Sequence, residues 1–90
     1  MPHFDWNEEK NSYLKETRKI GFEDVVTAFR ENKLVDVVDH PNQKKYKGQK
    51  IMFLLINDYV YAVPYIEDSN KLFLKTIYPS RTATQKYLRK

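Results

Sequence analysis

Apolar segments of strand length, separated by very short turns, constrain the fold of this 90-residue chain more than any other feature. Residues 50–57 read KIMFLLIN, a continuous apolar run that is typical of a strand buried on both faces. Asn57 and Asp58 supply a turn, and YVYAVPYI follows as a strand rich in β-branched and aromatic residues. Strands joined by so short a turn pair antiparallel, so the sequence predicts a hairpin here.

Two more segments extend this hairpin. Residues 34–39, LVDVVD, alternate loosely between apolar and polar, and residues 71–78, KLFLKTIY, follow the turn EDSN. Together the four segments predict an antiparallel meander. Pro64 lies inside the third strand and cannot donate to a ladder, so we expect a bulge or an unpaired edge there.

Three further segments predict helices. WNEEKNSYLKET can begin a helix after Asn7 as N-cap, with two carboxylates in the first turn where they suit the helix dipole. FEDVVTAFREN places four apolar side chains on one helical face, namely Phe22, Val25, Val26 and Phe29. Ser80 can cap a short last helix, SRTATQKYLRK, after Pro79 has ended the strand.

This order of elements predicts an α+β fold in a single domain over residues 1–90. It consists of two N-terminal helices, a four-stranded antiparallel meander sheet and a short C-terminal helix. We expect the helices to cover one face of the sheet and to leave the other face partly open.

Charge is distributed unevenly along the chain. Residues 1–39 carry a net charge of −3, whereas residues 40–90 carry +7. The strongly basic half suits a polyanion such as RNA or DNA, which Lys and Arg attract and from which they release counterions. A charged surface that is only solvated is the alternative. The acidic front and basic back together predict two different partners.

Several function classes lack the residues they need. The chain has no Cys, and its two histidines, His3 and His40, have no spacing typical of a metal site. Gly21 and Gly48 are the only glycines, so no Gly-rich phosphate loop is present. We therefore predict no metal, no cofactor and, because no long apolar run occurs, no membrane partner. The absence of Cys and of a signal-peptide pattern predicts a cytoplasmic protein.

The remaining residues suit cleavage of RNA without a metal ion. In that reaction the ribose 2′-OH is the nucleophile, so the protein supplies proton transfer and cations for the phosphate. Histidine ordinarily exchanges protons near neutral pH, which makes His40 the candidate general base or acid. Arg81, at the start of the last helix, can hold a phosphate with two donors and is the candidate transition-state stabiliser. A His that holds a turn and an ordinary helical Arg are the alternatives.

Residues 39–50, DHPNQKKYKGQK, place four lysines beside His40. They form either a solvated loop or a clamp for phosphates. Tyrosines of the basic half, such as Tyr46 and Tyr65, can stack on bases or simply pack in the sheet. The predicted RNA contacts are Lys44, Lys45, Lys50, Lys75 and Tyr78.

Three segments resemble one known family. FDWNEEKN, IGFEDVVTAF and KTIYPSRTAT are similar, in this order and at compatible spacing, to motifs of the BrnT family of bacterial toxins. The resemblance spans nearly the whole chain. The residues that match the motifs are Trp6, Lys10, Phe22, Glu23, Arg81, Ala83 and Thr84.

The resemblance implies a RelE-like ribonuclease toxin of a type II toxin–antitoxin system. Such a toxin inhibits translation by cutting RNA, and an antitoxin, typically a ribbon-helix-helix DNA-binding protein, neutralises it. DNA would be reached only through that antitoxin. This chain departs from the family pattern in the basic segment 39–50 and at Arg18, Lys19 and Ile20, where many members carry a His. A module that binds nucleic acid or protein without catalysis is the alternative function.

Overall fold

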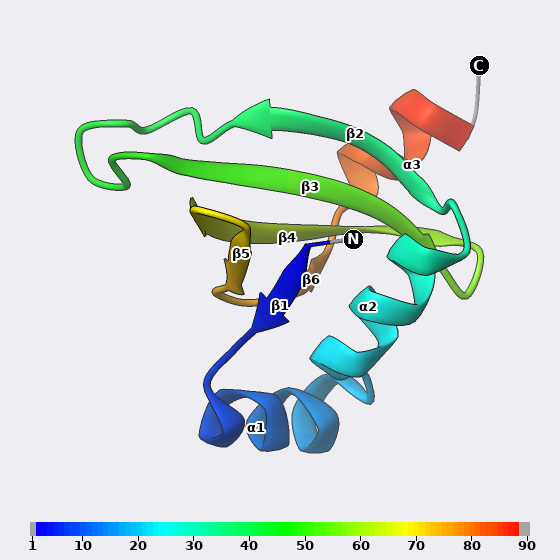
Figure 1. Cartoon of the computed structure of the whole chain (residues 1–90). Coiled ribbons are helices and arrows are strands. Elements are labelled where there is room, and N and C mark those ends of the chain that lie inside the picture. Colours follow the sequence, from blue (N-terminus) through cyan, green and yellow to red (C-terminus); the bar gives the residue numbers. More distant parts are fainter. Residues whose placement is uncertain (1, 89–90) are drawn as a thin grey trace.

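A six-stranded mixed sheet forms the centre of the fold (Figure 1). The computed structural model describes residues 2–88, and the strands lie in the order β1-β5-β4-β3-β2, with β6 paired to β4. The strands are β1 (His3–Asp5), β2 (Leu34–Asp39), β3 (Gln49–Ile56), β4 (Tyr59–Asp68), β5 (Lys71–Leu74) and β6 (Tyr78–Pro79).

The predicted α+β class and the four antiparallel segments are confirmed, but a simple four-stranded meander is wrong. Consecutive strands β2 to β5 pair antiparallel as expected, whereas β1 adds a parallel edge beside β5. β1 has only three residues, too few for an alternating pattern to be recognised. The predicted strand 71–78 ends at Leu74, and its last residues form the separate strand β6.

Pro64 lies at this interruption of the sheet edge. The register between β3 and β4 passes Pro64 without a shift, so the predicted bulge is absent. On its other side β4 pairs with β5 only from Tyr65 onward and with β6 only up to Ala62. The Pro64 carbonyl accepts from the Lys75 N–H at 2.8 Å. Because β4 pairs with neither β5 nor β6 at Pro64, the N–H that proline lacks is not required for pairing on this side.

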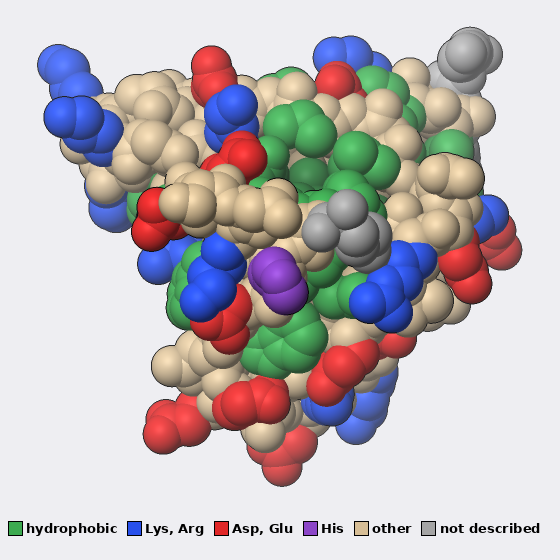
Figure 2. Space-filling view, viewed as in Figure 1, with side chains coloured by type: hydrophobic (Ala, Val, Ile, Leu, Met, Phe, Trp, Pro, Cys, Tyr) green, Lys and Arg blue, Asp and Glu red, His purple; other side chains and the backbone are tan. Residues whose placement is uncertain are grey.

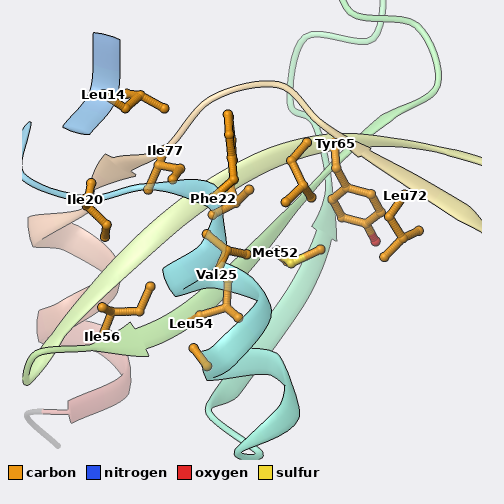
Figure 3. Packing of buried hydrophobic residues seen from close by; sticks show 13 residues of the cluster. Leu14, Ile20, Phe22, Val25, Met52, Leu54, Ile56, Tyr65, Leu72 and Ile77 are labelled. Atoms are coloured by element: carbon orange, nitrogen blue, oxygen red, sulfur yellow. The ribbon is translucent and has the colours of Figure 1, made fainter. Parts of the chain in front are cut away.

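The two N-terminal helices form as predicted and cover one face of the sheet. They are α1 (Glu8–Arg18), capped by the Asn7 side chain, and α2 (Phe22–Arg30). Their apolar side chains pack on alternate residues of β3, β4 and β5, which include Met52, Leu54 and Leu74 (Figure 3). We call this side the α1/α2 face.

The C-terminal helix α3 (Arg81–Leu88) packs on the opposite side of the sheet, which corrects the expectation that all helices share one face. As predicted, the Ser80 hydroxyl caps it by accepting from the Ala83 N–H. Tyr87 lies against Phe53, and buried Thr84 accepts from the Val60 N–H through its hydroxyl. We call this side the α3 face; α3 covers only part of it.

A hydrogen bond also joins the C-terminal turn of α3 to β2. The Tyr87 hydroxyl donates to the Asp36 carboxylate, and this bond holds the pKa of Asp36 below its ordinary value of 3.8. The same bond raises the pKa of Tyr87. The ionised Asp36 is therefore the form that favours the folded state.

Replacement of Tyr87 by Phe is expected to destabilise the protein at neutral pH and much less in acid. A carboxyl whose pKa is lowered by folding contributes stability above its ordinary pKa, and that stability is lost as the pH falls through the folded value. The difference in unfolding free energy between wild type and Tyr87→Phe should therefore shrink below about pH 4. Urea unfolding at neutral and acid pH measures it, and a pH-independent difference would contradict the assignment.

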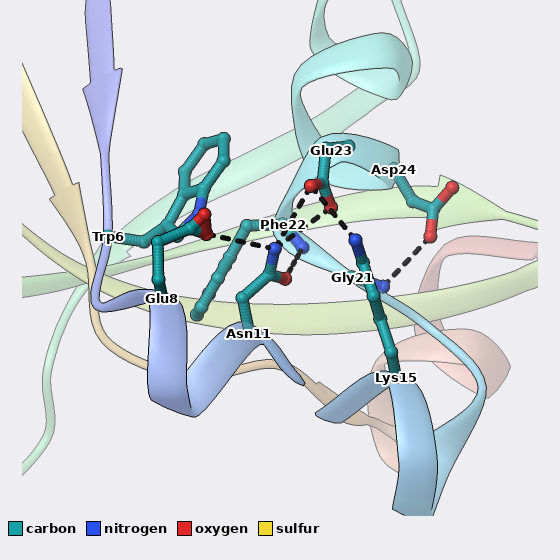
Figure 4. A network of polar contacts seen from close by, with 8 residues as sticks. All are labelled: Trp6, Glu8, Asn11, Lys15, Gly21, Phe22, Glu23 and Asp24. Carbon is teal, nitrogen blue, oxygen red and sulfur yellow. Dashed lines mark hydrogen bonds and ion pairs between the residues drawn. The ribbon is translucent and has the colours of Figure 1, made fainter. Parts of the chain in front are cut away.

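A polar network joins α1 to the start of α2 (Figure 4). Asn11 is only 3% exposed; its Oδ1 accepts from the Phe22 N–H at 2.7 Å, and its amide donates to the Glu23 carboxylate. A Cβ at Gly21 would lie 2.6 Å from the Lys15 Cε and 2.7 Å from a Glu23 carboxylate oxygen, so a larger residue there would require the ends of these two side chains to shift. Within residues 2–88, no helix is long and apolar enough to cross a membrane.

Candidate nucleic-acid interface

The part of the α3 face that α3 leaves open contains a hollow of about 250 Å³, which we call the His40 hollow. It lies between the end of β2, the loop after it and the segment that joins β5 to β6. Three of the predicted site residues therefore meet, although they are far apart in sequence. The lining residues are His40, Tyr46, Gln49, Pro64, Lys75, Thr76 and Tyr78.

His40 is fixed by its own backbone and by the loop that follows. Its N–H donates to the Gln49 carbonyl at 3.0 Å, and its ring lies on Tyr46 with 4.3 Å between centroids. The Asn42 N–H donates to Nδ1 at 3.1 Å. Because Nδ1 is an acceptor, the neutral imidazole carries its proton on Nε2, which has no hydrogen-bond partner among residues 2–88.

Lys75 and Tyr78 reach the hollow from the interrupted sheet edge. Residues 73 and 75 lie on the same side of the chain, and the Lys75 ammonium lies 5.3 Å from the centre of the Phe73 ring. Tyr78 pairs with Ala62, which faces α3, and its side chain is 37% exposed. Because β5 ends at Leu74, the chain that follows it places Lys75 and Tyr78 in the same hollow as His40.

Sequence reasoning missed Gln49 and Thr76 as lining residues. Gln49 follows the loop and pairs with Ile66, which places its side chain on the α3 face. Thr76 lies within the predicted last strand, and only the break in that strand brings it to the hollow. Neither residue belongs to a sequence motif, so only the pairing of the strands could have identified them as lining residues.

Lys44 and Lys45 lie in the loop and are exposed. The loop is folded on itself: Tyr46 N–H donates to the Asn42 carbonyl, and Gly48 N–H to the Gln43 side chain. The Lys45 ammonium lies 5.3 Å from the centre of the Tyr46 ring and so stays near the hollow. Figure 2 shows Lys side chains at the tip of this loop and mainly Asp and Glu side chains over α1, in agreement with the two-sided charge of the sequence.

Lys50 lies on the wrong face for a contact in the hollow. It pairs with Tyr65, and side chains of an antiparallel pair share one face of the sheet. Tyr65 is buried in the core of the α1/α2 face, at 6% exposure, and burial raises its pKa. Tyr65 is therefore a packing residue, and Lys50 points away from His40.

Arg81 is also separate from His40. His40, at the end of β2, donates its N–H to Gln49, and Gln49 pairs with Ile66 of β4. Ser80, the residue before Arg81, donates its N–H to the carbonyl of Val60, near the start of β4. These two β4 residues are six positions apart, so about 20 Å of strand separates the levels of His40 and Arg81. The predicted pair of catalytic residues is not brought together, and Arg81 does not line the hollow.

Most residues that carry the resemblance have structural contacts. Trp6 stacks on fully buried Phe22 with 5.5 Å between ring centroids, and Glu23 accepts from Asn11 and from Lys15. Burial acts to raise the pKa of Glu23, but the hydrogen bonds from Asn11, its own backbone and Lys15 outweigh it and lower that pKa. Ala83 and Thr84 are the buried residues of α3.

A comparison with protein-family models, with characterised proteins and with solved structures finds no match to this chain. In residues 2–88, no group of three or more His, Asp or Glu side chains is placed to hold a metal ion. The geometry of the His40 hollow is therefore the feature from which a function can be inferred.

Proposed function

We propose that the protein is a metal-independent endoribonuclease that inhibits translation by cutting RNA, and that the His40 hollow is its RNA site. One observation carries the proposal: a histidine and a tyrosine from residues 40–46, and a lysine and a tyrosine from residues 75–78, converge on the open part of the α3 face. These are the group types that proton transfer, phosphate neutralisation and base stacking require.

In this proposal Lys75 neutralises the phosphate, and His40 Nε2–H donates to a phosphate oxygen. The 2′-oxygen of the RNA forms a bond to the adjacent phosphorus while the bond from phosphorus to the 5′-oxygen breaks, so no protein nucleophile is needed. The 2′-OH gives up a proton and the departing 5′-oxygen takes one up, which leaves a 2′,3′-cyclic phosphate and a 5′-hydroxyl. For His40 to take a proton, Nδ1 has to lose the hydrogen bond from Asn42, because Nε2 is already protonated. Arg81 acts, if at all, on a phosphate farther along the strand.

The proposal includes the biological context implied by the resemblance. The protein would be the cytoplasmic toxin of a type II toxin–antitoxin system with a RelE-like fold, neutralised by a ribbon-helix-helix antitoxin. Support comes from the α+β fold with its antiparallel strands β2 to β5 and from the carboxylates of Glu8 and Glu9 in the first turn of α1, which suit the basic arm of a DNA-binding protein.

The decisive experiment combines purified protein, RNA and excess EDTA. We expect RNA fragments that end in a 2′,3′-cyclic phosphate, and we expect growth arrest on induced expression that is relieved by co-expression of the adjacent short gene. Intact RNA together with unimpaired growth would contradict the proposal. Folded protein must be shown in parallel, for example by a cooperative urea transition.

Two observations favour the alternative, a binding module without catalysis. The hydrogen bond from Asn42 holds His40 in the form that cannot accept a proton on Nε2, and Arg81 is remote. Such a module would bind RNA with an affinity that falls steeply with salt, and it would leave the RNA intact. The EDTA experiment separates the two functions directly.

A further inference from the structure

A second hollow shares Tyr78 with the first and lies at the β6 edge, toward the α1/α2 side of the sheet. It measures about 490 Å³ and is lined by Arg18, Tyr61, Tyr78 and Pro79; we call it the Arg18 hollow. Tyr78 is the one residue that lines both hollows. Of the four residues, sequence reasoning singled out only Tyr78 as a contact.

The Arg18 hollow has rigid walls. The Arg18 guanidinium donates to the Ile77 carbonyl at 2.9 Å, which ties the end of α1 to the segment before β6. The Tyr61 ring is partly buried and is held by Tyr59, edge to face, at 6.1 Å between centroids. Pro79 pairs with Tyr61 across β4 and β6. A guanidinium plane and two aromatic rings are surfaces on which bases stack.

We propose that the two hollows bind consecutive nucleotides of an unpaired RNA segment, with Tyr78 between the two bases. This inference rests on the proposed function for the identity of the ligand, and it adds that the substrate must be single-stranded over at least two nucleotides. Tyr78 lies on a two-residue edge strand, is 37% exposed and borders both hollows, which is the position that a ring between two bases requires. In a duplex the bases are paired and stacked on one another, so a side chain separates them only at the cost of unstacking.

The geometry assigns a different partner to each base. The base in the His40 hollow lies near Tyr46 and Lys75, and the base in the Arg18 hollow lies near Arg18 and Tyr61. The phosphate that joins the two nucleotides would lie beside Tyr78, on the side of the His40 hollow where Lys75 is found. The hollows measure about 250 and 490 Å³, which is just below and within the ~300–1,000 Å³ of ordinary small-ligand sites, so neither has room for more than about one nucleotide.

Binding of 2′-deoxy oligonucleotides tests the inference without cleavage, because they lack the nucleophile. We expect a dinucleotide to bind about 5- to 150-fold more tightly than a mononucleotide, which is the gain from stacking one more base. A duplex of the same sequence should show no such gain. Fluorescence titration or calorimetry at fixed low salt measures these affinities.

Variants locate the second base. Tyr78→Ala should abolish the gain from the second nucleotide, and Tyr78→Phe should keep it. Arg18→Met should reduce the gain from the second nucleotide, because it removes a planar wall of the Arg18 hollow. Tyr13→Ala is the matched control, because Tyr13 is an exposed tyrosine on α1 that lines neither hollow.

Equal affinity for mono- and dinucleotides, or a gain that survives Tyr78→Ala, would overturn the inference. If RNA is still cut in EDTA in that case, the proposed function stands without it. If the dinucleotide gain is present but no RNA is cut, the two-base site stands and the catalytic function fails.

Discussion

An Asn11→Ala variant is expected to unfold about 2 to 3 kcal/mol more easily than the wild type. Asn11 is 3% exposed, and its Oδ1 is the acceptor for the buried Phe22 N–H at 2.7 Å. Alanine leaves that N–H without a partner in a place that water does not reach. The Glu23 carboxylate also loses its amide donor, although solvent replaces this bond in part because Glu23 is exposed. For a domain of this size the melting temperature should fall by roughly 10 to 20 °C.

The matched control is Ser12→Ala, at the exposed neighbouring position of the same helix. Its effect should stay within about 0.5 kcal/mol, because a surface substitution to alanine in a helix removes no buried contact. Thermal and urea unfolding of the two variants give the comparison. If Asn11→Ala were as stable as Ser12→Ala, the buried bond to Phe22 would not hold α1 against α2.

The helices and the long strands could be predicted because their patterns are local. The apolar spacing of residues 22–29 and the caps at Asn7 and Ser80 act within one helical turn, and the structure confirms them. β1 could not be predicted, because its three residues form a strand only by pairing with β5, almost seventy positions away. Asn11 gave no signal either, since its role depends on the docking of α2.

The candidate site could be predicted only in part, for a related reason. Alternation along a strand tells which residues share a face, but not where a strand breaks. The sequence predicts a continuous strand over residues 71–78, and nothing in that pattern places Lys75, Thr76 and Tyr78 beside His40. In the structure the strand breaks after Leu74, opposite Pro64, and the residues after the break line the His40 hollow. Nor does the sequence reveal which residues pair across neighbouring strands. This register separates Arg81 and Lys50 from His40.

This separation has a measurable consequence for energetics. Residues that lie about 20 Å apart without shared partners ordinarily contribute independently. If Arg81 contacts RNA at all, substitutions of Arg81 and His40 should have additive effects on cleavage. Residues that share the hollow, such as His40 and Lys75, should be non-additive.

His40→Asn is expected to lower the rate of RNA cleavage at least about 100-fold, which is the usual contribution of a group that transfers a proton. The variant is chosen because the amide oxygen of Asn can take the place of Nδ1 and accept from the Asn42 N–H. The loop should therefore keep its fold, while proton transfer is lost. Single-turnover cleavage of a labelled RNA in EDTA gives the rate, and binding of the 2′-deoxy analogue reports whether the site is intact.

The matched control is His3→Asn, which changes the other histidine of the chain, on β1 and outside the hollow. It should cleave at the wild-type rate. A His40→Asn variant that binds the deoxy analogue normally but cuts no RNA assigns a chemical role to the imidazole. If that variant instead cleaves as fast as His3→Asn, proton transfer does not pass through His40. The Asn42 bond to Nδ1 would then be its whole function, and the chemistry would have to come from Lys75, Arg81 or the RNA itself.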